Sequence, residues 1–150
     1  MEKIKSISKL TAFSMVVILL TSCTSIRLIS DYDEITDIKV TELQEKFAQH
    51  FVKLERVLGT EQANYENFIQ FYDGIKADLS TLRVRANAID KNEIVIKQLD
   101  FLDRNVSDLE SLHKIGFKKT SEIVPLKDAF DRAFTAIIKL QMGLKRGEKG

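Results

Sequence analysis

Glu110 and His113 come closest to a metal site among the residues of this sequence. They stand three residues apart, the Glu-x-x-His spacing with which helical bundles hold pairs of metal ions. A complete site needs a second such motif and two further glutamates, but the other histidine, His50, has Phe47 three residues before it. The ligand set is incomplete, and we therefore predict no metal site.

The expected positions of the two histidines also disfavour a shared metal ion. If the first and third helices run parallel from about residues 37 and 93, His50 and His113 differ in height by about 10 Å, at 1.5 Å per residue. One ion does not readily bridge that distance. We interpret His50 as a core residue beside a polar partner, and His113 as a cation near the negative end of a helix dipole.

Motifs for the common covalent and cofactor chemistries are absent from the 150 residues. The sequence contains no serine-nucleophile motif, glycine-rich phosphate loop or zinc-protease motif. Its single cysteine cannot supply the ligand sets of haem or copper sites. The aromatic residues Tyr65, Phe68, Phe71 and Tyr72 could line a pocket, but their helical spacing is typical of a core. We expect no enzyme activity and no bound cofactor.

The only cysteine, Cys23, follows an apolar run near the start of the chain. Three lysines precede roughly eleven mostly apolar residues, 10–20, and small polar residues come next. This order is typical of an export signal, whereas a membrane-spanning helix needs about 20 apolar residues. We therefore predict that residues 1–22 form a cleaved signal peptide.

The four residues Leu20-Thr21-Ser22-Cys23 resemble the lipobox of bacterial lipoprotein precursors. An ordinary secretory cleavage site would have a small residue in place of Leu20. The resemblance implies cleavage before Cys23, a covalent lipid on this cysteine as the only attached group, and the bilayer as a partner. Thr24 stands where an inner-membrane retention signal has aspartate, which implies the outer membrane, facing the periplasm.

The charge balance gives no reason to expect nucleic acid as a partner. The precursor has 23 basic and 22 acidic side chains. Removing residues 1–22 takes away three lysines and one glutamate, so 20 basic and 21 acidic side chains remain. Nucleic acid is bound by concentrated Lys and Arg, and this near-neutral composition does not predict such a surface.

Apolar residues at alternating spacings of three and four predict four helices in a domain of residues 37–147, after a tether of residues 23–36. The short connections make neighbouring helices antiparallel, which specifies an all-α, up-and-down four-helix bundle. The connection at 90–92 has neither Gly nor Pro, so a three-helix alternative with one long bent helix stays open. The predicted core positions are Val40, Leu43, Phe47, Phe51, Leu54, Val57 and Leu58; Tyr65, Phe68, Tyr72, Ile75, Leu79, Leu82, Ala86 and Ile89; Val95, Leu99, Leu102, Val106 and Leu109; and Leu126, Phe130, Ala133, Ile137, Leu140 and Leu144.

As a whole, and most of all in "CTSIRLISDYDEITD" at 23–37, the chain resembles the small helical lipoproteins of Gram-negative cell envelopes. This resemblance implies no activity and no functional residues. We expect a membrane-anchored periplasmic lipoprotein that binds another envelope protein; the alternative is a small-ligand or metal binder that uses the bundle interior. An apolar patch that includes Phe71, Phe101, Phe134 or Ile138 would favour the first function. A cavity lined by polar groups would favour the second.

Overall fold

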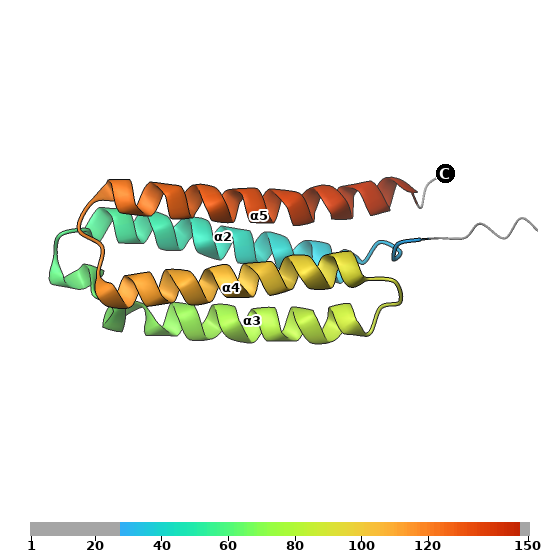
Figure 1. Ribbon diagram of the computed structural model, residues 1–150, viewed down its shortest axis with the longest axis horizontal. Coiled ribbons are helices and arrows are strands. Elements are labelled where there is room, and N and C mark those ends of the chain that lie inside the picture. Colours follow the sequence, from blue (N-terminus) through green and yellow to red (C-terminus); the bar gives the residue numbers. More distant parts are fainter. Residues whose placement is uncertain (1–27, 148–150) are drawn as a thin grey trace, which may run out of the picture.

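The computed structural model describes residues 28–147, which form four α-helices and no strand within that range. The helices are α2 (Glu34–Val57), α3 (Ile69–Asn87), α4 (Glu93–Ile115) and α5 (Thr120–Gly147). Two short 3-10 helices, Glu61–Ala63 and Tyr65–Phe68, join α2 to α3. Successive helices run in opposite directions along one long axis (Figure 1). The predicted all-α, up-and-down four-helix bundle is confirmed.

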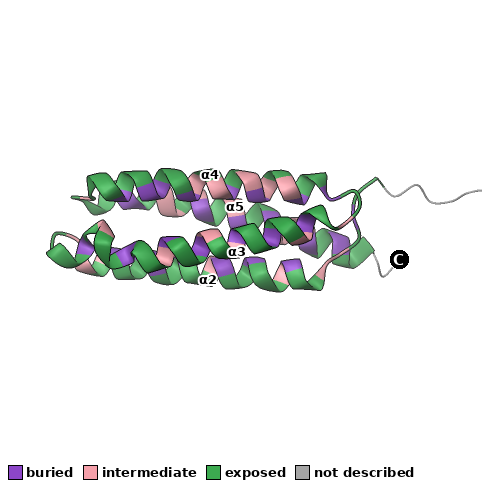
Figure 2. Ribbon diagram, turned by 90° about the horizontal axis from the view of Figure 1, so that it is seen from below, coloured by how far each residue is buried: buried purple, intermediate pink, exposed green. Residues whose placement is uncertain are grey.

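The four helices are arranged as two close pairs. α2 packs most extensively against α5, and α3 against α4. The α2–α3 and α4–α5 sides are less closely packed, and they lie on opposite faces of the bundle (Figures 1 and 2). The described chain begins and ends at the same end of the bundle, beside the α3–α4 turn (Figure 1).

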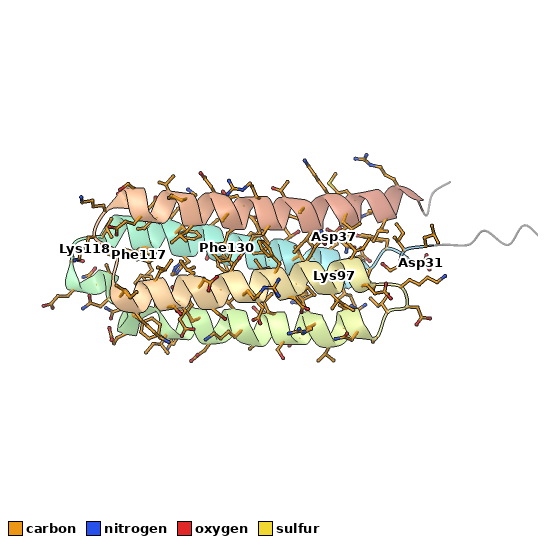
Figure 3. The ribbon with its side chains drawn as sticks, in the orientation of Figure 1. Asp31, Asp37, Lys97, Phe117, Lys118 and Phe130 are labelled. Carbon is orange, nitrogen blue, oxygen red and sulfur yellow. The ribbon has the colours of Figure 1, made fainter. Side chains whose placement is uncertain are left out.

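Most of the predicted core positions are buried along the faces that the helices turn toward one another (Figure 2). Phe47 of α2 lies near the middle of this core and stacks on Phe130 of α5, with ring centroids 4.3 Å apart; Figure 3 shows Phe130 between the helices. The confirmed core positions are Val40, Leu43, Phe47, Phe51, Leu54, Phe68, Tyr72, Ile75, Leu79, Leu82, Ala86, Val95, Leu99, Leu102, Val106, Leu109, Phe130, Ile137 and Leu144.

The second predicted helix is shorter than its apolar pattern indicated. Tyr65 and Phe68 belong to a 3-10 helix, and α3 begins only at Ile69. The extended backbone of Asn64 (φ −65°, ψ 145°) separates the two 3-10 turns and prevents one continuous helix. Ile89 lies beyond the end of α3, in the turn that leads to α4.

The buried face of α5 also differs from the predicted one. Phe134 and Gln141 are 1% exposed, whereas Ala133 and Leu140 are only half-buried. Both sets of positions fit a helical period, and the larger Phe134 removes more apolar surface from water than Ala133 would. Ala133 and Leu140 therefore pack against the edge of the core rather than inside it, and Phe134, one of the four residues whose exposure would have indicated a patch, is buried.

The turn between α3 and α4 separates these helices clearly. Lys91 has a positive φ of 59°, a conformation that a continuous helix does not contain. The buried side-chain amide of Asn92 donates to the carbonyl of Ala86 over 3.0 Å, so it holds the turn against the end of α3. The three-helix alternative is excluded.

The segment before α2 is bound to this same turn. The Ser30 N–H donates to the Lys91 carbonyl, and the buried Ser30 hydroxyl donates to Asn92 Oδ1, each over 3.0 Å. α2 begins at Glu34, three residues before the predicted start of the bundle, and Asp33 is its N-cap. The predicted tether of residues 23–36 therefore extends too far along the chain.

Asp33 joins the start of α2 to the end of α3. It accepts from the Thr36 N–H over 3.1 Å, and from Arg85 Nε over 2.6 Å and Arg85 Nη2 over 2.5 Å. The Arg85 guanidinium, assisted by Thr36, lowers the pKa of Asp33 to about 2. This charged N-cap fixes the position of the incoming chain on the bundle.

Candidate docking groove and histidine cluster

An apolar groove runs along the less closely packed α4–α5 side. It has a volume of about 480 Å³. Small alanines on α5 lie opposite larger side chains on α4, and this difference in size leaves the space open. The groove is lined by Ile94, Lys97, Gln98 and Phe101 from α4 and by Ala129, Arg132, Ala133 and Ala136 from α5.

Two large apolar side chains of this groove are open to solvent. Phe101 is 50% exposed and Ile94 is 47% exposed. They stand seven residues apart on one face of α4, about 10 Å along the helix axis. Of the four residues considered for an exposed patch, only Phe101 is exposed; Phe71 and Ile138 are half-buried against the core, and Phe134 is buried.

Both charged residues that line the groove are cations. Lys97 projects from α4 (Figure 3), and Arg132 lies on α5. Neither residue forms an ion pair with any other residue of 28–147. The enclosed Oε1 atom of Gln98 has no hydrogen-bond partner within the same range. The groove therefore combines an apolar floor with unpaired positive charge and an acceptor without a donor.

His113, in the last turn of α4, lies in a buried cluster of rings with His50, Phe68 and Tyr72. Only 1% of it is exposed, its Nδ1 lies 2.8 Å from the Tyr72 hydroxyl, and its Nε2 lies 2.8 Å from the Ala63 carbonyl oxygen. The carbonyl can only accept, so Nε2 carries the proton, and the Tyr72 hydroxyl donates to Nδ1. Burial lowers the pKa of His113. The prediction of a cation near a helix end was wrong, because the ring turns inward and is neutral.

His50 is buried close to His113, and no polar partner for it lies among residues 28–147. It is 4% exposed, and neither ring nitrogen has a hydrogen-bond partner within residues 28–147. Its ring stacks on that of Phe71, with centroids 3.8 Å apart and planes inclined by 7°. Burial, and to a lesser degree His113 and Lys53, lower the pKa of His50 to about 3. The predicted polar partner of His50 is not found among residues 28–147.

The two histidine rings are closer together than predicted, with centroids 6.1 Å apart. α2 begins at Glu34 rather than near residue 37, so His50 and His113 lie 16 and 20 residues into their helices. Four residues correspond to about 6 Å of height instead of about 10 Å. The argument from distance against a shared metal ion was therefore wrong.

Glu110 has other partners than a metal ion. Its carboxylate accepts from the Tyr65 hydroxyl over 2.6 Å, pairs with Lys114 over 3.0 Å and also pairs with Lys76. Lys76 and Tyr65 lower the pKa of Glu110 to about 2. Within residues 28–147, no group of three or more His, Cys, Asp or Glu side chains is placed to hold a metal ion.

A hollow of about 300 Å³ opens beside His50, between α2 and α3. It is more polar than the α4–α5 groove. Both ring nitrogens of His50 are enclosed, so a molecule in this hollow does not reach them unless side chains move. The lining residues are Lys46, Gln49, His50, Lys53, Asn67, Phe68, Gln70 and Phe71.

We expect His50→Phe to stabilise the bundle by about 1–3 kcal/mol at neutral pH, because it removes buried polar atoms that have no partner. His113→Phe is the matched control. It leaves the Tyr72 hydroxyl and the Ala63 carbonyl without their partner, and should lower the free energy of unfolding by about 1–3 kcal/mol. Urea unfolding of the wild type and both variants measures these differences.

The same comparison tests the pH dependence. The unfolded chain protonates His50 near its ordinary pKa of 6.5, whereas the folded chain keeps it neutral down to about 3. The contribution of His50 to stability is therefore fully present above pH 6.5 and is lost as the pH is lowered from 6.5 to about 3, by up to about 1.4 kcal/mol per pH unit. His50→Phe should flatten this fall. A less stable variant with the wild-type pH slope would contradict the assignment.

The proposed lipid-attachment site, Leu20-Thr21-Ser22-Cys23, lies outside the described residues. Between residues 28 and 147, no helix combines the length and the apolar character needed to cross a membrane. The candidate functional features among residues 28–147 are therefore the α4–α5 groove and the buried pair His50 and His113. Comparisons of the chain with protein-family models, with curated proteins and with solved structures find no match.

Proposed function

We propose that this chain is a lipid-anchored protein of the cell envelope that binds another envelope protein through the α4–α5 groove. The lipobox-like segment supports the anchor, and the exposed side chain of Phe101 above an open apolar groove supports the docking role. The anchor places the protein at the outer membrane, facing the periplasm. No enzyme activity and no nucleic acid partner form part of this proposal.

The groove fits an amphipathic helix with acidic residues along its border. Helices that dock in grooves use apolar anchors at spacings of three, four and seven residues. Seven residues correspond to about 10 Å, the separation of Ile94 and Phe101 along α4. Acidic side chains beside those anchors would meet Lys97 and Arg132, which have no ion-pair partner of their own among residues 28–147.

The alternative function, binding of a small ligand, is supported by the polar hollow beside His50. This hollow is smaller than the groove, at about 300 Å³ against about 480 Å³. The enclosed nitrogens of His50 would not contact its contents. We therefore favour the groove as the functional surface.

A photo-reactive phenylalanine analogue at Phe101 tests the docking role in intact cells. We expect a discrete cross-linked product, because a docked helix covers this side chain. The same analogue at Leu112, which is 42% exposed further along α4 and outside the groove, is the matched control. It should give no such product.

Charge reversal then tests the chemistry of the partner. Lys97→Glu combined with Arg132→Glu should reduce the Phe101 product at least about tenfold, since two attractive contacts become repulsive. A peptide that spans the captured helix should bind the purified wild type and bind this double variant at least about tenfold more weakly. Equal products from positions 101 and 112, or a Phe101 product that charge reversal leaves unchanged, would contradict the proposal.

A further inference from the structure

The bound segment before α2 shortens the connection between the anchor and the bundle. Because Ser30 is held by Lys91 and Asn92, only the stretch of chain from Cys23 to Ser30 separates the proposed anchor from the bundle. Seven residues span at most about 25 Å, at 3.3–3.6 Å each. The 23 residues of α4 extend over about 35 Å. A lipid on Cys23 would therefore keep the α3–α4 turn near the bilayer, and the opposite end of the bundle further away.

Exposed apolar side chains gather at this same end. Leu28 is 83% exposed and Val84, in the last turn of α3, is 71% exposed. Ile29 and Ile35, which flank the start of α2, are 43% and 48% exposed. These side chains stay largely open to solvent, and they lie where the proposed lipid anchor would hold the protein.

A second apolar groove lies between α2 and α3, and two of these exposed side chains, Ile35 and Val84, line it. Its volume is about 540 Å³. It lies between the first turns of α2 and the last turns of α3, and therefore near the α3–α4 turn (Figure 1). The apolar residues that line it are Ile35, Leu82, Val84 and Ala88.

The charges around the α2–α3 groove are already paired within the protein. Lys39 pairs with Glu42 over 2.6 Å, and Arg85 holds Asp33. The fourth charged lining residue, Asp78, pairs with Lys46 over 2.5 Å. Within residues 28–147 this groove therefore offers no unpaired charge to an acidic partner, in contrast to the α4–α5 groove with Lys97 and Arg132. Its apolar lining with paired charges around it fits the interfacial region of a bilayer, where polar headgroups solvate the charges and the acyl boundary contacts the apolar side chains.

We propose that the α2–α3 groove and the side chains of Leu28 and Ile29 rest on the surface of the lipid bilayer. The bundle is then inclined, with its anchored end in the interfacial region. The α4–α5 groove, on the opposite face, points away from the membrane and stays accessible to its partner. This orientation rests on the proposed lipid anchor, and it adds a second, non-covalent contact between the folded domain and lipid.

Cysteine labelling tests the orientation, because the lipid would occupy the only natural thiol. Val84→Cys and Ile115→Cys each supply one new thiol at a residue that is 71% and 81% exposed, at opposite ends of the bundle. Each full-length variant is purified from membranes, labelled with a small fluorophore and reconstituted into phosphatidylcholine vesicles whose acyl chains carry bromine atoms. Unbrominated vesicles give the reference intensity.

We expect the label at position 84 to lose at least about half of its intensity, because quenching by bromine requires contact with the acyl region. The label at position 115 should keep its intensity. Adding Ile35→Asp to Val84→Cys should restore most of the signal, since this new carboxylate, unlike Glu42 and Asp78, would have no ion-pair partner supplied by the groove and is costly to bring into contact with lipid. Equal intensities at positions 84 and 115 would overturn the orientation.

Flotation of the same vesicles separates this proposal from the anchor. Protein that floats with the vesicles while position 84 is not quenched keeps the anchor and overturns the orientation. Protein that does not float overturns both. Floating protein with quenching at position 84 alone supports both.

Discussion

Cys23→Ser is expected to remove the protein from the outer membrane. Each buried methylene of an acyl chain contributes about 0.8 kcal/mol, and stable attachment needs at least two chains, so losing the lipid removes the dominant interaction with the bilayer. Fractionation of cell envelopes on a density gradient measures the result. The variant should leave the outer-membrane fraction, apart from uncleaved precursor that the apolar segment holds weakly at the inner membrane.

Ser22→Ala is the control for this substitution. It replaces one small residue of the lipobox-like segment with another, so the variant should still be cleaved and fractionate like the wild type. The folded bundle, which begins beyond both positions, should melt at the same temperature in each case. A Cys23→Ser protein that is cleaved normally and stays in the outer membrane would contradict the assignment of Cys23.

Phe47→Ala should have the largest effect on stability, a loss of about 3–5 kcal/mol in the free energy of unfolding. Phe47 is 2% exposed, and besides its stack on Phe130 its ring centroid lies 5.3 Å from that of Phe71 and 5.4 Å from that of Phe134. Alanine would leave a cavity where two helices of a close pair and the neighbouring α3 meet. Urea unfolding of the soluble fragment from Ser25 onward measures the loss.

Phe101→Ala, the same substitution at a half-exposed position, is the matched control. It should change the free energy of unfolding by less than about 1 kcal/mol, because little surface is removed from water there. Losses of similar size in both variants would mean that the assigned core is not the region that stabilises the bundle.

The helices were predictable because the apolar residues of their buried faces recur at spacings of three and four. In α4, the positions of Leu99, Leu102, Val106 and Leu109 are apolar and their neighbours are mostly polar, so only one face can be buried. In α5, both position 133 and position 134 are apolar, and a periodic pattern alone does not decide which of Ala133 and Phe134 is buried. The packing of Phe134 near Phe47 decides it.

The candidate docking and membrane surfaces were less predictable, because they depend on contacts between distant segments. The hydrogen bond between Ser30 and Asn92 joins residues 62 positions apart, and nothing local in "ISDYD" indicates it. The groove residue Phe101 lies outside the apolar periodicity of α4, which was the one available signal of an exposed patch. The alanines opposite Phe101 form one wall of the groove only because α5 packs beside α4, and the sequence pattern alone does not place them opposite this residue.

The histidine cluster shows the same dependence on exact helix starts. A shift of three residues in the start of α2 changes the expected height of His50 by about 4.5 Å. That shift decides whether the two rings are separate or adjacent. Sequence patterns place helix ends less accurately than this, so the contact between His50 and His113 could not be predicted.

The mass of the N-terminal peptide from wild-type protein in the membrane fraction shows directly whether Cys23 carries a lipid. The proposed lipid anchor underlies the proposed location, the proposed docking role and the proposed orientation of the bundle on the bilayer. We predict a peptide that begins at Cys23 and carries a diacylglyceryl group on its sulfur and an acyl chain on its amino group. A mature, membrane-bound chain with an unmodified Cys23 would contradict the proposed lipid anchor.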